Sequence, residues 1–141
     1  MKIYIAGPLF CEAERAFNEK IDLILRECGH ETFLPQRDAG RVDSMPDYID
    51  GKPKRVYVFR KDCEHMDWCD TVLFLMDGRV PDEGACFELG YCCAAKKRLI
   101  GYKTDSRSFM QGHENAMLDG SLEIVLHDEK ELRSFFGKEG L

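Results

Sequence analysis

The sequence predicts an α/β protein built on a doubly wound, five-stranded parallel sheet with helices on both faces. Short runs rich in β-branched and aromatic residues alternate along the chain with longer segments whose apolar residues recur at helical spacing. One short run, "TVLFLM" at 71–76, is apolar at every position, which is typical of a strand covered by helices on both sides. Alternating strands and helices of this kind build a parallel sheet.

The first half of the chain is expected to contain two strands and one helix. "KIYIAG" at 2–7 predicts a strand that stops at a Gly-Pro pair, and apolar residues at helical spacing predict a helix over 12–28 that ends before a glycine. "ETFLP" at 31–35 predicts the second strand. The stretch 36–53 is rich in Asp, Gly and Pro, so we expect a long polar loop or a short helical excursion there.

The second half continues the alternation. Val56, Phe59, Cys63 and Met66 recur at helical period and are expected to form the apolar face of a helix over 54–69. The remaining elements are a strand at 71–76, a helix that follows Asp82, a strand at 98–103, a polar stretch at 104–121, a strand at 122–127 and a helix at 128–136.

Five parallel strands with helices between them favour the flavodoxin-like strand order 2-1-3-4-5, in which ligands bind beyond the carboxyl ends of the strands. No internal repeat, low-complexity tract or linker interrupts the chain, so residues 1–141 are expected to form a single domain. The ends of the first and third strands, and the start of the helix after Asp82, should therefore meet at one edge of the sheet.

Composition and charge exclude several classes of protein. The 141 residues are 44% hydrophobic and 33% charged, as in globular proteins. A net charge of −6 argues against nucleic-acid binding, which normally uses a basic surface. No apolar run is long enough to cross a membrane, and the first residues lack the pattern of a signal peptide. A cytoplasmic protein is therefore expected.

The seven cysteines form no CxxC pair, and the four histidines stand singly. An odd number of cysteines without a secretion signal argues against disulfides, and a zinc site would need closely spaced ligands. We expect most of the thiols to be small core residues, and we predict no metal and no cofactor.

Glu88 is the anomaly of the helix that follows Asp82. Its neighbours three and four positions away carry no charge that could pair with it: Gly84, Ala85, Tyr91 and Cys92. A carboxylate on the small, apolar side of a helix is costly to bury without a cation. It is either bonded to backbone amides or to Tyr4 as part of the packing, or it belongs to a functional site with open space beside it.

Other acids lie near the same edge of the sheet. Asp82 is placed to cap the helix of Glu88, and Asp62 lies at the margin of the apolar face of the preceding helix. A pure cap for Asp82 and a boundary acid for Asp62, bonded to solvent or to an arginine, are the alternatives. Asp70 and Asp77 are best explained as a cap and a turn residue. Carboxylates that converge on one cleft suit glycoside cleavage, in which one acid is protonated and another is ionised.

Motifs for other chemistries are absent. The chain contains no GxGxxG after a strand, no GxxxxGK[ST] and no GxSxG, so dinucleotide binding, P-loop nucleotide binding and a serine triad are not indicated. A phosphoacceptor receiver domain shares the fold, but it needs an acidic pair after the first strand, where this chain has Ala6-Gly7-Pro8.

Four stretches, in this order, resemble the nucleoside 2-deoxyribosyltransferase family. They are "IYIAGPLF" at 3–10, "DCEHMDWCD" at 62–70, "DEGACFELGY" at 82–91 and "ENAMLDG" at 114–120. The resemblance implies the flavodoxin-like fold and an enzyme of nucleotide salvage that needs no cofactor. Such an enzyme exchanges the base of a 2'-deoxynucleoside through a covalent deoxyribosyl-enzyme.

The resemblance also implies catalytic roles. Glu88 matches the nucleophile that attacks the sugar C1', and Tyr4 matches the tyrosine that bonds to this carboxylate. Asp82 matches the acid that binds the departing base or gives it a proton, and Asp62 matches a second acid that contacts the base.

Substrate contacts follow from the same motifs. They are predicted for Gly7, Pro8, Phe10, Gly84, Asn115 and Met117. In the family, the asparagine of "NAML" reaches the sugar 5'-hydroxyl in a neighbouring subunit, which implies a homo-oligomer, a dimer or a multiple of dimers, with shared active sites. The implied partners are a 2'-deoxynucleoside and a free nucleobase, with no nucleic acid and no membrane. The family's C-terminal segment has no clear counterpart in "FFGKEGL".

Two other functions compete with deoxyribosyl transfer. A 2'-deoxynucleoside 5'-monophosphate N-glycosidase has the same fold, but the loops "AGPLFCEAE" and "GRVPDEGAC" contain acids and no serine, so a phosphate would meet like charge. We therefore expect a free 5'-hydroxyl and transfer. A non-catalytic nucleoside or nucleotide sensor is the other alternative, and the intact set of Tyr4, Asp62, Asp82 and Glu88 favours an enzyme over it.

Overall fold

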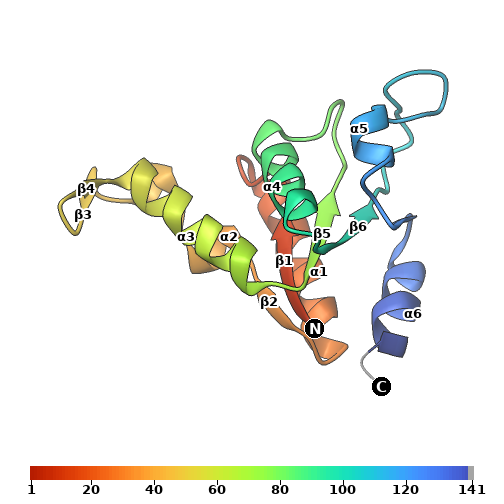
Figure 1. Ribbon diagram of the computed structural model, residues 1–141, viewed down its shortest axis with the longest axis horizontal. Coiled ribbons are helices and arrows are strands. Elements are labelled where there is room, and N and C mark those ends of the chain that lie inside the picture. Colours follow the sequence, from red (N-terminus) through yellow and green to blue (C-terminus); the bar gives the residue numbers. More distant parts are fainter. Residues whose placement is uncertain (140–141) are drawn as a thin grey trace.

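A five-stranded parallel sheet forms the centre of the computed structural model (Figure 1). Its strands are β1 (Lys2–Ala6), β2 (Glu31–Phe33), β5 (Thr71–Leu75), β6 (Arg98–Tyr102) and β7 (Ile124–Leu126). They lie in the order β2-β1-β5-β6-β7, and every neighbouring pair is parallel. Counted along the chain, this is the order 2-1-3-4-5, which confirms the flavodoxin-like prediction. The structure describes residues 1–139, so the last two residues of "FFGKEGL" lie outside the described part.

Helices cover both faces of the sheet. Helices α1 (Glu12–Glu27) and α6 (Glu129–Glu139) pack on one face, and α3 (Lys54–Trp68) and α4 (Glu83–Ala94) pack on the other. Strand β1 divides its side chains between the two cores. Ile3 and Ile5 join the core under α1 and α6, whereas Tyr4 and Ala6 join the core under α3 and α4. Because side chains alternate along a strand, this register points Tyr4 toward α4.

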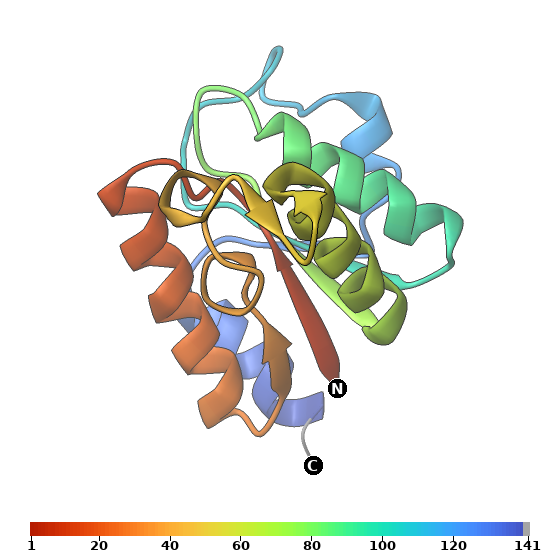
Figure 2. The ribbon, with the colours of Figure 1, turned by 90° about the vertical axis from the view of Figure 1, so that its left-hand side faces the viewer.

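The segment between β2 and α3 is more structured than predicted. The second strand ends at Phe33 because Pro35 begins α2 (Pro35–Asp38), where proline fits the first helical position. A short 3₁₀ helix η1 (Val42–Ser44) follows, as the expected helical excursion. An unpredicted antiparallel hairpin of β3 (Tyr48–Ile49) and β4 (Lys52–Pro53) then leads into α3. In Figure 2 this segment runs between α1 and α3.

The predicted apolar face of α3 is only partly correct. Met66 is buried and Cys63 is half-buried, but Val56 is 38% exposed and Phe59 is 55% exposed. The first half of α3 extends past the sheet together with the β3–β4 hairpin (Figure 1), so these two side chains have no sheet to pack against.

Five of the seven cysteines lie in the two cores or pack against them, which agrees with the prediction that most are core residues. Cys69 and Cys92 are buried, whereas Cys11 and Cys93 are exposed. The remaining three are half-buried: Cys28, Cys63 and Cys86. Cys11 is exposed because it is the N-cap residue of α1, whereas Cys28, the C-cap residue, packs against the core. All seven are free thiols.

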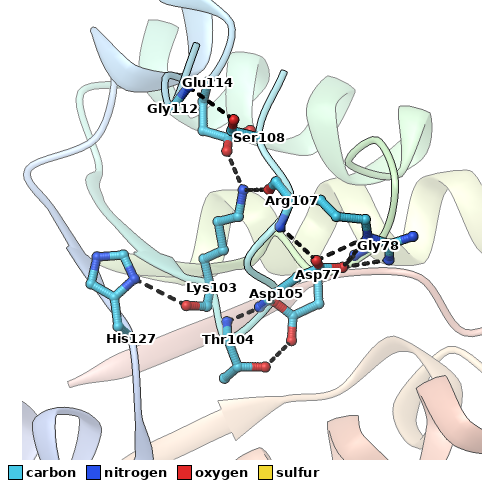
Figure 3. A network of polar contacts seen from close by, with 10 residues as sticks. All are labelled: Asp77, Gly78, Lys103, Thr104, Asp105, Arg107, Ser108, Gly112, Glu114 and His127. Atoms are coloured by element: carbon cyan, nitrogen blue, oxygen red, sulfur yellow. Dashed lines mark hydrogen bonds and ion pairs between the residues drawn. The ribbon is translucent and has the colours of Figure 1, made fainter. Parts of the chain in front are cut away.

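Asp70 and Asp77 have structural roles, but each ties two segments together and is not the predicted helix cap or turn residue. Asp70 Oδ2 accepts a hydrogen bond from the backbone N–H of Lys2 at 2.9 Å, which ties the start of β5 to β1. Asp77 follows β5, and its Oδ1 accepts from the backbone N–H groups of Thr104 at 2.7 Å and Asp105 at 2.8 Å (Figure 3). The two loops at the carboxyl ends of β5 and β6 are therefore joined.

The polar stretch 104–121 is further held by Lys103. Its ammonium pairs with Glu114 and donates to the carbonyl of Arg107, and the ion pair is largely buried (Figure 3). Helix α5 (Ala116–Asp119) follows, with Asn115 as its cap. The described residues include no helix that is long and apolar enough to cross a membrane.

Candidate active site

A cavity of about 610 Å³ opens at the carboxyl edge of β1 and β5, which is the predicted place for a ligand. Its walls come from the loop after β1, the first part of α1, the segment 35–43, α3 and α4. Six of the predicted site residues line it: Gly7, Phe10, Asp62, Asp82, Gly84 and Glu88.

Glu88 is bonded to Tyr4 at the inner end of this cavity. The Tyr4 hydroxyl donates to Glu88 Oε1 at 2.8 Å, and Tyr4 is fully buried. Among the described residues, Glu88 Oε2 has no hydrogen-bond partner, and the side chain lines the cavity. The missing partner of Glu88 is therefore a tyrosine from the neighbouring strand, which holds one carboxylate oxygen while the other has no protein partner.

The environment of Glu88 favours the protonated form of the carboxyl group. Burial raises the pKa of Glu88 to about 8, and the nearby charges of Asp62 and Asp82 act in the same direction. The hydrogen bond from Tyr4 opposes them and lowers this pKa. The pKa of the Tyr4 phenol is itself raised, mainly by burial and then by the charge of Glu88, so Tyr4 keeps the proton that it donates.

Asp62 is the most unusual polar group of the cavity. Of all side-chain nitrogen and oxygen atoms in residues 1–137, its Oδ1 alone is fully buried without a hydrogen-bond partner. Burial raises the pKa of Asp62 to about 7. These facts contradict the alternative of a boundary acid bonded to solvent or to an arginine. A buried polar atom without a partner requires an explanation, and a ligand in the cavity would provide one.

Asp82 caps α4, and the glycine that follows it makes room for this cap. Asp82 Oδ2 accepts from the backbone N–H of Ala85 at 2.9 Å. A Cβ atom at Gly84 would lie 3.1 Å from the same oxygen, so a larger residue would press on the carboxylate. At Gly7 a Cβ atom would lie 2.9 Å from Cβ of Leu75, which explains why the loop after β1 needs glycine to cross β5.

A buried amide that the sequence did not point to connects two walls of the cavity. Asn18 of α1 is 3% exposed, and its Nδ2 donates to the carbonyl of Pro8 at 2.8 Å and to Gln36 Oε1 at 2.9 Å. Gln36 Nε2 in turn donates to the carbonyl of Arg15 at 3.0 Å. The loop after β1 and helix α2 are thus held on α1 by one small network.

Three predicted substrate contacts lie outside the cavity. Pro8 turns away from it and lines a depression on the other side of the loop. Asn115 caps α5, where its Oδ1 accepts from the backbone N–H of Met117 at 2.9 Å. Met117 is 80% exposed. Within one chain, the structure does not bring Asn115 and Met117 to the carboxylates.

Three cations that the sequence analysis missed also line the cavity: Arg15, Arg41 and Lys54. They come from three separate segments, so no local motif unites them. The one available signal is the spacing of Lys54, Val58 and Asp62, which places them on one face of α3. In the part of the chain that the structure describes, no three His, Cys, Asp or Glu side chains are grouped so that they could hold a metal ion.

Residues 3–132 match the family model described as nucleoside 2-deoxyribosyltransferase. The chain belongs to this family. Among solved structures, it is similar to a 2-deoxyribosyltransferase from the psychrotolerant bacterium Bacillus psychrosaccharolyticus, with 27% identity and a TM-score of 0.78 over 94% of this chain and 90% of that one.

Two further proteins are similar to the chain, one in fold alone and one over only about half of its own length. A CMP N-glycosidase from Clostridium botulinum is 18% identical, with a TM-score of 0.61 over 96% of this chain and 97% of that one, and at this identity it shows only a shared fold. An uncharacterized protein of Schizosaccharomyces pombe is 31% identical over 113 residues, or 76% of this chain. The match covers 52% of that protein, so the chain spans about half the length of this relative.

Proposed function

We propose that the protein transfers a 2-deoxyribosyl group between nucleobases, with Glu88 as the nucleophile of a covalent intermediate. The hydrogen bond between Tyr4 and Glu88 supports this proposal most strongly, because it holds a carboxylate without a counter-ion at the inner end of a cavity. The family of the chain and the likeness to a 2-deoxyribosyltransferase agree with it.

In the first half of the proposed reaction, Glu88 Oε2 attacks C1' of the sugar. An ester bond forms between this oxygen and C1', and the bond between C1' and the base nitrogen breaks. The electron pair of that bond leaves with the base, which needs a proton. Asp62 suits this role, because its raised pKa of about 7 keeps part of it protonated at neutral pH, and Asp82 binds the base beside it.

In the second half, a nitrogen of the incoming base attacks C1' from the side that the first base left. The ester bond breaks, and its electron pair returns to the Glu88 carboxylate. The proton of the incoming base passes to the acid that gave one up. Tyr4 orients Glu88 in both halves, and its hydrogen bond stabilises the carboxylate as it leaves.

A second copy of the chain completes the site in this proposal. Asn115 and Met117 lie outside the cavity of their own chain, and Met117 is exposed. A partner subunit would bring them to the sugar, as the resemblance implied. A homo-oligomer and a cytoplasmic location both stay predictions.

Incubation with thymidine and adenine tests the proposed function. We expect deoxyadenosine and thymine to appear together, and Glu88→Gln to reduce the rate by at least about a thousandfold because the nucleophile is lost. Chromatography of the products measures both rates, and the melting temperature of the variant checks that it is folded. Thymine without deoxyadenosine would show hydrolysis instead, and binding of thymidine without any product would show a sensor.

A further inference from the structure

The cavity is lined by cations as well as acids. Asp62, Asp82 and Glu88 line it from α3 and the start of α4, whereas Lys54 and Arg41 line it from the first residue of α3 and the segment 35–43, where Asp43 pairs with Arg41. Lys54 precedes Asp62 by eight residues on the same face of α3, which places their backbones about 12 Å apart along the helix. This separation is comparable to the length of a nucleoside.

The acidic partners of Lys54 and Arg41 are more exposed than the cations are. The side chain of Lys54 is 23% exposed, and that of its partner Asp47, at 3.1 Å, is 85% exposed. The side chain of Arg41 is 34% exposed, and that of its partner Asp43 is 63% exposed. Such exposed ion pairs are weak. Asp47 does not line the cavity, so Lys54 can turn to a ligand while its partner stays hydrated, whereas Asp43 lines the cavity beside Arg41.

Arg15 adds a third positive charge to the wall. Its Nη1 donates to the carbonyl of Leu9 at 3.1 Å, and no carboxylate in residues 1–137 forms an ion pair with it. A neutral deoxynucleoside gives no reason for two cations, Arg15 and Lys54, that have no ion-pair partner in the wall of the cavity.

We infer that the preferred substrate carries an anionic group at the end remote from Glu88, bound by Arg15, Arg41 and Lys54. The inference rests on the proposed function and narrows its substrate class. Two chemical sources of the negative charge are compatible with the geometry. One is a phosphate on the sugar 5'-oxygen, and the other is a carboxylate on the nucleobase.

The acids of the two loops do not prevent this binding, in contrast to the sequence-based expectation. Glu14 is turned to the backbone, where it accepts from the N–H groups of Phe10 at 2.7 Å and Cys11 at 3.1 Å. Glu12 and Glu83 are exposed and do not line the cavity. Of the acids in those loops, Asp82 alone lines it, and its Oδ2 already accepts from the backbone N–H of Ala85.

Matched pairs of substrates test the inference with the full-length protein. In the first arm, cleavage of thymidine is compared with that of thymidine 5'-monophosphate. In the second arm, uracil is compared with 5-carboxyuracil as the acceptor of deoxyribose from thymidine. We expect the wild-type protein to prefer the anionic member of one pair by at least about tenfold in kcat/KM. The arm that shows the preference identifies the source of the charge.

Lys54→Met and Arg15→Gln should each lower kcat/KM for the anionic member about tenfold, through a higher KM. For the neutral member, kcat/KM should stay within about twofold of the wild-type value. Arg55→Gln is the matched control, because Arg55 is exposed on the same helix and lies outside the cavity wall. Equal rates for both members of both pairs, or equal losses in Arg55→Gln, would overturn the inference. Transfer between neutral substrates would then still support the proposed function, which fails if Glu88→Gln stays active or if thymidine and adenine give no deoxyadenosine.

Discussion

At the scale of single residues, the main feature of the site is a carboxylate balanced between opposing influences. Burial and two neighbouring acids raise the pKa of Glu88 to about 8, and the hydrogen bond from Tyr4 lowers it. A nucleophilic carboxylate must be ionised, so its activity increases with pH. As a consequence, the Glu88 carboxyl group is protonated in a large fraction of the molecules at neutral pH before substrate binds.

These opposing effects on the pKa of Glu88 predict that the pH–rate profiles of two variants shift in opposite directions. Tyr4→Phe removes a hydrogen bond that lowers the pKa of Glu88, so the rising limb of kcat/KM should move to higher pH. Asp62→Asn removes a negative charge that raises the same pKa, so the rising limb of the residual activity should move to lower pH. Steady-state rates from pH 5 to 10 measure both shifts. Shifts in the same direction would contradict the description of Glu88.

At the scale of elements, the cavity depends on how the loop after β1 and helix α2 are attached to α1. Asn18 makes both attachments with one amide group, and its carbonyl partner Pro8 belongs to the loop that contributes Gly7 and Phe10 to the cavity. Removing a buried donor leaves two acceptors unsatisfied at once.

Asn18→Ala is therefore expected to lower the free energy of unfolding by about 1–3 kcal/mol. It should raise KM more than it lowers kcat, because the cavity wall loosens while Tyr4 and Glu88 stay in place. Denaturant unfolding and steady-state kinetics measure these effects. Glu19→Gln is the control on the same helix: Glu19 is exposed and accepts only a peripheral bond from Gln36, at 3.2 Å, so its change should stay within about 0.5 kcal/mol. A lower kcat with unchanged KM in Asn18→Ala would contradict this role.

At the scale of the whole molecule, periodicity was sufficient to predict the sheet, because the strands and the long helices pack against one another, although α3 does so only in its second half. The strand order and the covering of both faces are confirmed. The segment 36–53 was not predictable in detail, because its short elements are held by distant partners such as Asn18 and not by their own pattern.

The residues of the candidate site also divide into those that a local pattern predicted and those that only the folded chain brings together. Asp62, Asp82 and Glu88 were found because each one breaks a local pattern of its helix or occupies a cap. Arg15, Arg41 and Lys54 break no pattern where they stand, so only the assembled cavity brings them together. The positions of Asn115 and Met117 show why motif order alone is not sufficient, since a single chain leaves both outside the cavity.

A covalent deoxyribosyl intermediate on Glu88 would change the mass of the intact protein. After incubation with thymidine and no acceptor base, we expect a mass increase of one deoxyribosyl unit. Peptide mapping should locate this increase on Glu88, and addition of adenine should remove it as deoxyadenosine forms. Product formation without any such increase would exclude a covalent intermediate, and an increase that persists in Glu88→Gln would exclude Glu88 as the nucleophile.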